Sequence, residues 1–193
     1  MSREEQILAA ATRLFAERSF DGVGVDAIAA DAGVTGSAIY RHFSSKDEIL
    51  AALFDRLIDA LLIRIGEPAD DPDAEIDGLI AAHVEFSIAH PELTIIWGRE
   101  QAALAHVYRA NLQRRQRAYV DRWIQALDTR YPGLSRDELA AAVRATHALM
   151  TSDTSRPAST RRIAGLGPLL CSLAKAALAP LGDPPPARVA GSS

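Results

Sequence analysis

The spacing of apolar residues predicts helices along almost the whole chain. In residues 3–19 the apolar positions recur every three or four residues, which places them on one face of a helix. We find no convincing stretch of the alternating pattern that marks a β-strand. The same helical spacing predicts further helices at residues 26–32, 36–43, 46–65, 74–89, 91–106, 107–129, 135–151 and 161–179. We therefore predict an all-α protein.

Several helix ends carry recognisable signals. Three Ser-x-x-Glu motifs have the form of a capping box, in which serine and glutamate satisfy backbone amides reciprocally. They are Ser2–Glu5, Ser45–Glu48 and Ser135–Glu138. Gly33 suits the left-handed position after a helix, where a Cβ would clash. A break near Gly98 is expected to interrupt the segment that begins at Pro91.

These elements suggest two domains. The first, residues 1–46, has three helices, and the last two are joined by a short glycine-containing turn, as in a helix-turn-helix. The second, residues 47–181, is a larger helical domain. Residues 182–193 include three consecutive prolines and are expected to be disordered.

Composition narrows the class of protein. The net charge is −4, and the first 46 residues are nearly balanced in charge, so the chain is not a bulk polyanion binder. A single cysteine, Cys171, excludes a disulfide framework and a cysteine-built zinc site. We see no secretory signal and no stretch long enough to span a bilayer. We therefore expect a cytoplasmic protein that does not contact membranes.

The second helix of the helix-turn-helix has the residues expected of a DNA-reading helix. Small side chains at its start allow close approach to a base edge or a phosphate, and the helix dipole favours the polyanion there. Tyrosine, arginine, histidine and lysine follow and can reach bases or phosphates. The candidate DNA-binding residues are Thr35, Gly36, Ser37, Tyr40, Arg41, His42 and Lys46.

Residues 3 to about 53 resemble the N-terminal domain of the TetR family of bacterial repressors. The resemblance is densest at the turn Ala29–Val34, at Ile39-Tyr40, at Phe43 and at Ser45–Glu48. It implies a homodimer shaped like an Ω, which places paired recognition helices on a palindromic operator. The chain departs from the family at Gly24, Gly36 and Ala38, where threonine, lysine and threonine are usual. The expected contacts therefore shift to Thr35, Ser37, Tyr40, Arg41, His42 and Lys46.

The resemblance also implies a small-molecule inducer, bound within the C-terminal helices, and a dimer face formed by the last two long helices. The inducer could be hydrophobic or anionic. Aromatic and neighbouring residues supply the candidate ligand contacts, which are Leu62, Phe86, Trp97, Tyr119, Trp123 and His147. Two apolar stripes supply the candidate dimer face, with the core of one subunit as the less favoured alternative. Those residues are Leu139, Val143, Thr146, Met150, Leu166, Leu170, Leu173 and Ala177.

Other interpretations remain open. The arginines at 109, 114, 115 and 117 favour a solvated helix face, with an anionic ligand as the alternative. We find no nucleophile motif and no phosphate-binding loop, so we expect neither an enzyme nor a cofactor. A metal-dependent enzyme built on His83, His106 and His147 is one alternative function. A helical protein-interaction module without a DNA role is the other. The chain does not distinguish repression from activation.

Overall fold

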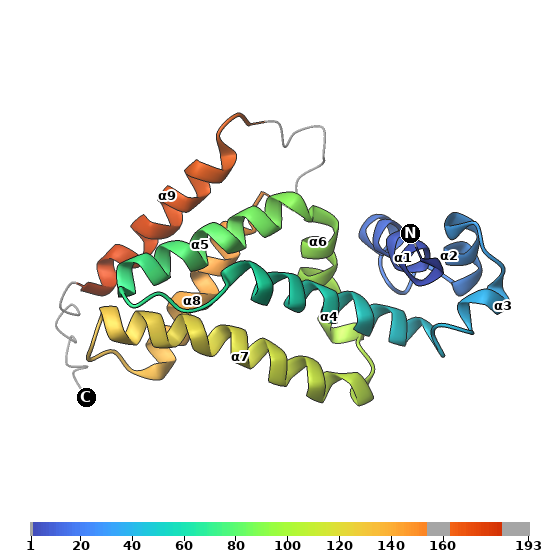
Figure 1. Ribbon diagram of the computed structural model, residues 1–193, viewed down its shortest axis with the longest axis horizontal. Coiled ribbons are helices and arrows are strands. Elements are labelled where there is room, and N and C mark those ends of the chain that lie inside the picture. The colour runs from blue at the N-terminus through green and yellow to red at the C-terminus, as the bar shows by residue number, and fades with distance from the viewer. Residues whose placement is uncertain (1, 154–162, 183–193) are drawn as a thin grey trace, which may run out of the picture.

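The computed structural model describes residues 2–153 and 163–182 of the chain. Every regular element in those residues is helical, which confirms the all-α prediction (Figure 1). The elements are α1 (Arg3–Arg18), α2 (Val25–Ala32), α3 (Gly36–Ile39), α4 (Lys46–Ile65), α5 (Pro72–Ala89), α6 (Pro91–Glu100), η1 (Gln101–Ala103), α7 (His106–Arg130), α8 (Arg136–Met150), α9 (Leu166–Leu178) and η3 (Ala179–Gly182).

The first three helices pack on one another and on the start of α4. The apolar stripe of α1 turns inward, and the side chains of Phe15, Ile28 and Ile39 are almost inaccessible to solvent. The turn between α2 and α3 forms as expected, with Gly33 in the left-handed conformation at φ 66°. Val34 then donates its N–H to the Ala29 carbonyl at 3.0 Å, which closes the turn.

The helix ends follow the capping motifs with one variation. Both hydrogen bonds of the capping box are present at Ser2 and at Ser135. At Ser45 only one forms, because the Glu48 carboxylate accepts from the backbone and hydroxyl of Ser44 instead. These local bonds fix where α1, α4 and α8 begin.

Several boundaries differ from expectation. Helix α3 ends at Ile39 and not at residue 43, and α5 begins at Pro72 and not at residue 74. The break after α6 falls at Glu100 and not at Gly98, because η1 follows and turns the buried Leu104 inward. The last long helix begins at Leu166, since Gly165 adopts a left-handed conformation; residues 161 and 162 lie outside the described residues. The expected disordered tail falls at 183–193, which are also outside them, while Gly182 belongs to η3.

The larger helical group is built around α4, α5 and α7, which pack against each other in pairs. Helices α8 and α9 pack together and cover α5 and α7 on the side remote from α3 (Figure 1). Helix α4 also contacts α1, so it extends continuously from the N-terminal helices into the larger group. The proposed boundary at residue 46 therefore lies at the start of one unbroken helix.

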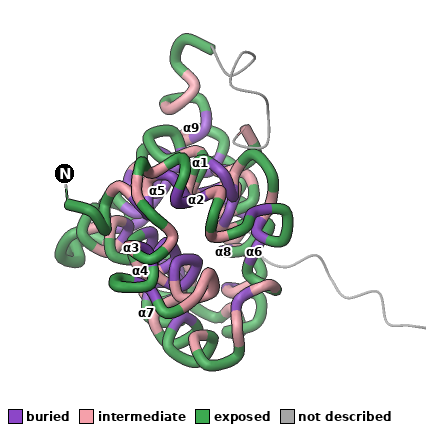
Figure 2. The backbone as a smooth tube through the Cα atoms, turned by 90° about the vertical axis from the view of Figure 1, so that its right-hand side faces the viewer, coloured by how far each residue is buried: buried purple, intermediate pink, exposed green. Residues whose placement is uncertain are grey.

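Burial follows the helical pattern in both groups. In Figure 2 the buried segments lie on the inward faces of the helices, and exposed segments form the outside. In the described residues no helix is both long enough and apolar enough to cross a membrane.

Candidate nucleic-acid interface and ligand cavity

Helix α3 presents polar side chains at the end of the molecule remote from α9 (Figure 1). Ile39 and Phe43 anchor it by packing into the core, while Ser37 and Tyr40 remain exposed, Tyr40 at 60%. The Thr35 side chain caps the helix by accepting from the Ala38 N–H at 3.2 Å. The segment is therefore held rigidly from beneath while its outer face is free to contact another molecule.

The residues after α3 extend this exposed face. Arg41 and His42 are both exposed, and they lie in a turn stabilised by the His42 N–H bond to the Ile39 carbonyl at 2.9 Å. Nearby, Arg13 forms an ion pair with Asp31 of α2 at 2.6 Å, which neutralises one acidic side chain close to the segment. Cationic, hydroxyl and aromatic groups thus share one surface, which is the chemistry used to bind phosphates and base edges.

Lys46 has a different arrangement from the one expected. Its ammonium donates to the carbonyls of Phe20 and Val23 at 2.8 and 3.0 Å and lies 4.1 Å from the centre of the Phe20 ring. Two of its three donors are therefore engaged within the protein. The expectation of a free ammonium for a phosphate is corrected: Lys46 chiefly ties the turn before α2 to the start of α4.

A cavity of about 70 Å³ lies among the helices of the larger group. Of the six candidate ligand residues, Phe86, Trp97, Tyr119 and His147 line it. Residues from the five helices α4 to α8, together with Thr151 directly after α8, form its wall: Leu57, Ile58, Leu61, His83, Phe86, Ser87, Thr94, Trp97, Gln116, Tyr119, Val120, His147 and Thr151.

Two of the candidate ligand residues do not line the cavity. Leu62 is partly buried against the core on a neighbouring face of α4, because the face that carries Leu57, Ile58 and Leu61 is the one turned to the cavity. Trp123 is fully buried behind the wall, and the centre of its ring lies 4.9 Å from the centre of the His147 ring. The helical period groups Leu62 with Leu57, Ile58 and Leu61 in one apolar stripe, so it could not separate Leu62 from the residues that line the cavity. Among the polar wall residues, the sequence gave no signal for Ser87, Thr94, Gln116 and Thr151.

One end of the cavity is formed by a cluster of rings. The His83 Nδ1 and the Tyr119 hydroxyl form a hydrogen bond of 2.7 Å. The imidazoles of His83 and His147 stack with their centres 4.5 Å apart. His106, the third histidine considered, lies at the exposed start of α7 and does not line the cavity.

Burial keeps these rings uncharged at neutral pH. Desolvation lowers the pKa of His147 to about 4. Desolvation and the neighbouring His147 hold the pKa of His83 well below its ordinary value. Burial also raises the pKa of Tyr119, which keeps its phenol protonated. The cluster therefore offers hydrogen bonds without net charge.

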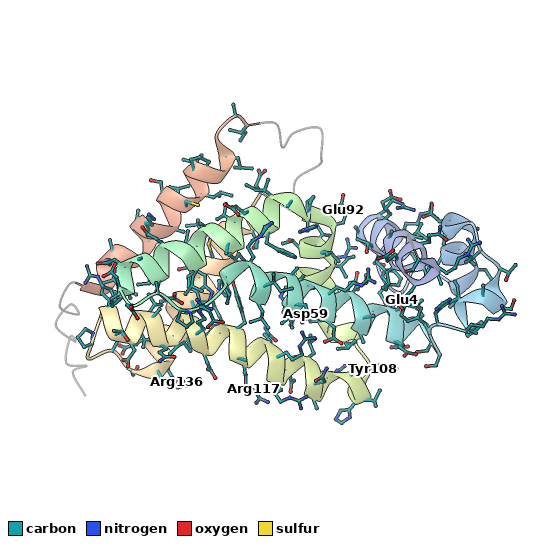
Figure 3. The ribbon with its side chains drawn as sticks, in the orientation of Figure 1. Glu4, Asp59, Glu92, Tyr108, Arg117 and Arg136 are labelled. Atoms are coloured by element: carbon teal, nitrogen blue, oxygen red, sulfur yellow. The ribbon has the colours of Figure 1, made fainter. Side chains whose placement is uncertain are left out.

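The arginines of α7 lie away from the cavity. Arg109 donates to the carbonyls of Leu104 and Ala102, at 2.7 and 2.9 Å, and so fixes the turn before its own helix. Arg115 pairs with Asp55 at 2.5 Å and with Asp59, which joins α7 to α4. Arg114 bonds Asn111, and Arg117 extends outward from α7 (Figure 3). The solvated and structural interpretation of this run is the one that the contacts favour.

Helix α6 connects the cavity to the N-terminal helices. Thr94 and Trp97 line the cavity from α6. At the end of the same helix, Arg99 donates to the carbonyls of Phe15 and Ala16 in α1 and pairs with Glu100 at 2.8 Å. The buried Glu100 carboxylate also accepts the Phe20 N–H at 3.2 Å. The last turn of α1 is thus held directly by the helix that lines the cavity.

Most residues expected to form a dimer face are buried within the single chain. Leu139, Val143, Thr146, Met150 and Leu170 are at most 5% exposed, because α8 and α9 turn these stripes onto α5, α7 and each other. They are corrected to core residues. Leu166 is half-buried, while Leu173 and Ala177 are exposed. Other exposed apolar residues lie on the same two helices: Ala141, Ala145 and Ala148 on α8, and Leu169 and Ala176 on α9.

Comparisons with known proteins give a consistent picture. Residues 7–53 match the model of the bacterial regulatory proteins of the tetR family. The HTH-type transcriptional repressor KstR2 of Mycobacterium tuberculosis is 30% identical over 131 residues, which is 66% of this chain and 66% of that protein. The HTH-type transcriptional activator FasR of Mycolicibacterium smegmatis is 42% identical over 60 residues, or 31% of this chain and 27% of that one.

Solved structures share the fold at lower identity. KstR2 of Mycobacterium tuberculosis has a TM-score of 0.76 at 21% identity, covering 92% of this chain and 94% of that one. AibR, solved in complex with isovaleryl coenzyme A and operator DNA, has a TM-score of 0.73 at 19% identity, covering 89% and 95%. The matched sequence thus spans just under two thirds of KstR2, whereas the likeness in fold extends along most of the chain.

Proposed function

The chain belongs to the TetR family of bacterial regulatory proteins, and we therefore propose that it is a ligand-responsive, sequence-specific DNA-binding transcriptional regulator. The observation that carries the proposal is the exposed polar face of α3, presented by the domain that matches the family model. Within this proposal the protein acts as a repressor in the bacterial cytoplasm and is released from DNA by a small molecule. It has no enzymatic role.

The DNA contacts divide by position. Thr35, Gly36 and Ser37 at the start of α3 come close to the DNA, and Tyr40 meets a base edge or a thymine methyl. Arg41 and His42 contact phosphates, which fix the register of the protein on the duplex. Lys46 contributes its remaining donor to a phosphate only after its two internal bonds are made.

A homodimer completes the proposed DNA-binding surface, because it supplies a second copy of α3. The exposed apolar positions of α8 and α9, centred on Ala145 and Leu173, suit a four-helix contact across a twofold axis. Such a dimer presents two α3 segments to half-sites about 34–36 Å apart on a palindrome. Size-exclusion chromatography of Leu173→Glu, expected to elute as a monomer while wild type elutes as a dimer, tests this face.

The inducer acts by shifting the protein between two arrangements of its helices. AibR shows that a neighbour of the same fold holds both a small molecule and operator DNA. In this chain α4 carries Leu57 and Leu61 at the cavity and begins beside the α3 turn, while α6 connects Trp97 to α1 through Arg99. A ligand that prefers one position of these helices changes the spacing of the two α3 segments.

Binding to DNA tests the proposal directly. The full-length protein is titrated against the DNA upstream of its own gene and against mixed-sequence DNA of equal length, at several salt concentrations. We expect affinity for the upstream site to exceed that for mixed DNA by about 10³-fold or more, and both to fall steeply with salt. Equal affinity for both DNAs would contradict the proposal and favour a protein-interaction module.

A further inference from the structure

We propose that the cavity takes a small uncharged ligand with an apolar body and one hydrogen-bonding group, and that this group pairs with the Nε2 of His147. The inference rests on the proposed function in that the ligand is the inducer. It names the chemical class of that inducer from the wall of the cavity.

The body of the ligand is set by the composition of the wall. Aliphatic side chains of α4 and the aromatic rings of Phe86 and Trp97 make up much of it. None of the described residues that line the cavity is a lysine, arginine, aspartate or glutamate. A charged ligand would lose its hydration here without meeting an opposite charge, and this loss is large for an isolated ion.

The polar group of the ligand is set by His147. Its Nε2 is buried and has no hydrogen-bond partner among the described residues. Among the nearby polar groups, His83 Nδ1 bonds Tyr119 and the Ser87 hydroxyl donates to the His83 carbonyl at 2.9 Å. The Nε1 of Trp123 is also buried without a partner among the described residues, but Trp123 does not line the cavity. A buried imidazole nitrogen without a partner is costly, so a ligand that supplies the partner gains affinity that an apolar ligand lacks.

Charge discrimination follows from the protonation state of the same rings. With a pKa of about 4, His147 is neutral at pH 7.5 and attracts neither an anion nor a cation. As a neutral ring it can donate to, or accept from, one polar group. A ketone, alcohol or amide therefore suits the cluster, whereas a carboxylate meets no cation.

The size of the cavity favours a compact ligand. About 70 Å³ is several times the space of roughly 10–15 Å³ that one water needs. A six-membered ring with one substituent is a suitable probe. Cyclohexanone and methylenecyclohexane form a matched pair, because they share a shape and differ only in the carbonyl oxygen. Cyclohexanecarboxylate and cyclohexylammonium add the two charges.

The experiment measures binding of these four probes to the full-length protein without DNA at pH 7.5. Calorimetry gives the affinity, and tryptophan emission reports the site, because the two tryptophans line the cavity or contact His147. We expect cyclohexanone to bind at least tenfold more tightly than each of the other three. Equal or tighter binding of a charged probe, or no binding of cyclohexanone, would overturn the proposal.

Variants locate the polar contact. His147→Phe should remove the advantage of cyclohexanone over methylenecyclohexane, and His147→Gln should keep most of it because an amide can still pair. His106→Gln, the same change at an exposed histidine, should match wild type. An advantage that survives in His147→Phe overturns the assignment. If that variant does not fold, loss of the advantage in His147→Gln overturns it instead.

The result is independent of DNA binding. A protein that prefers cyclohexanone but binds upstream and mixed DNA equally retains the ligand class and loses the proposed function. A protein that binds its upstream DNA specifically but prefers the carboxylate loses only the ligand class.

Discussion

The α3 surface and the cavity are built from residues at very different separations along the chain. The α3 surface comes from one stretch, residues 35–42, held by local bonds such as the Thr35 cap. The cavity collects side chains from Leu57 to Thr151, over α4, α5, α6, α7 and α8. A surface made from one segment is encoded in that segment, whereas a cavity depends on how several helices pack.

The two regions also differ in chemistry. The α3 surface is exposed, polar and partly cationic, and suits a hydrated polyanion. The cavity is lined by aliphatic, aromatic and uncharged polar side chains, and its histidines are kept neutral by burial. Substitutions at the first should therefore change binding with little effect on stability, and substitutions around the second should change stability first.

The largest expected effect is on the cavity side. Trp123→Ala removes a fully buried ring behind His147 and should lower the free energy of unfolding by about 3–5 kcal/mol. Urea denaturation followed by circular dichroism measures it. Tyr40→Ala, at an exposed ring, serves as the control and should stay within about 0.5 kcal/mol of wild type. Similar losses of unfolding free energy in both variants would contradict the proposed difference in stability between the cavity and the α3 surface.

The histidine cluster predicts a pH dependence of stability. The pKa of His147 falls from 6.5 to about 4 on folding, so the unfolded chain binds more protons between these values. Its contribution, about 3 kcal/mol at most, is therefore complete above pH 6.5 and is lost as the pH falls towards 4. Denaturation at a series of pH values should show that the free energy of unfolding declines less steeply with falling pH in His147→Gln than in wild type. An unchanged slope would show that His147 does not cause the decline.

The α3 surface predicts a loss of specificity. Tyr40→Ala should weaken binding to the specific site by about 1–3 kcal/mol, and by less on mixed DNA, because the ring reads a base and not only the backbone. Fluorescence anisotropy with both DNAs measures the difference. Arg41→Ala is the comparison, since loss of a phosphate contact should weaken both alike. Equal losses for Tyr40→Ala would reassign the tyrosine to the backbone.

The Arg99–Glu100 link predicts a change in communication between the two regions. Glu100→Gln weakens the pair with Arg99 and the bond to the Phe20 N–H, at a cost of about 1–2 kcal/mol in stability. It should also reduce the ratio of DNA affinities measured without and with cyclohexanone several-fold. Glu92→Gln, at an exposed glutamate of the same helix, is the control. If the ratio of DNA affinities is undiminished in Glu100→Gln, α4 alone connects the cavity to the α3 surface.

The smallest expected effect concerns Lys46. Lys46→Met removes two bonds to carbonyls and should lower stability by about 1 kcal/mol. Because the ammonium is occupied within the protein, the slope of log affinity against log salt should change by less than one, the change expected when a full phosphate contact is lost. A full unit of change would show that Lys46 makes a full phosphate contact and not the partial one proposed above.

Much of the fold could be predicted because its signals are local. The capping boxes at Ser2 and Ser135 and the left-handed Gly33 were readable, since each depends on residues within one turn. The end of α6 was misplaced because its cause is distant from Gly98: Leu104 is drawn into the core and Arg109 binds its carbonyl. Local glycine content carried no information about those contacts.

The dimer stripes show the same limit. Leu139 and Leu173 both belong to apolar stripes in sequence, yet one packs within the chain and the other is exposed. Helical period states which residues share a face but not which neighbour that face meets.

The sequence alone determined the helices, their caps and the small-residue start of α3, because these depend on interactions between residues three or four positions apart. Tertiary structure decided which face of α4 lines the cavity, that His83 and His147 stack there as neutral rings, and that Lys46 turns inward. These outcomes depend on side chains brought together from distant helices, where burial and the available partners set both the contacts and the charge of each group.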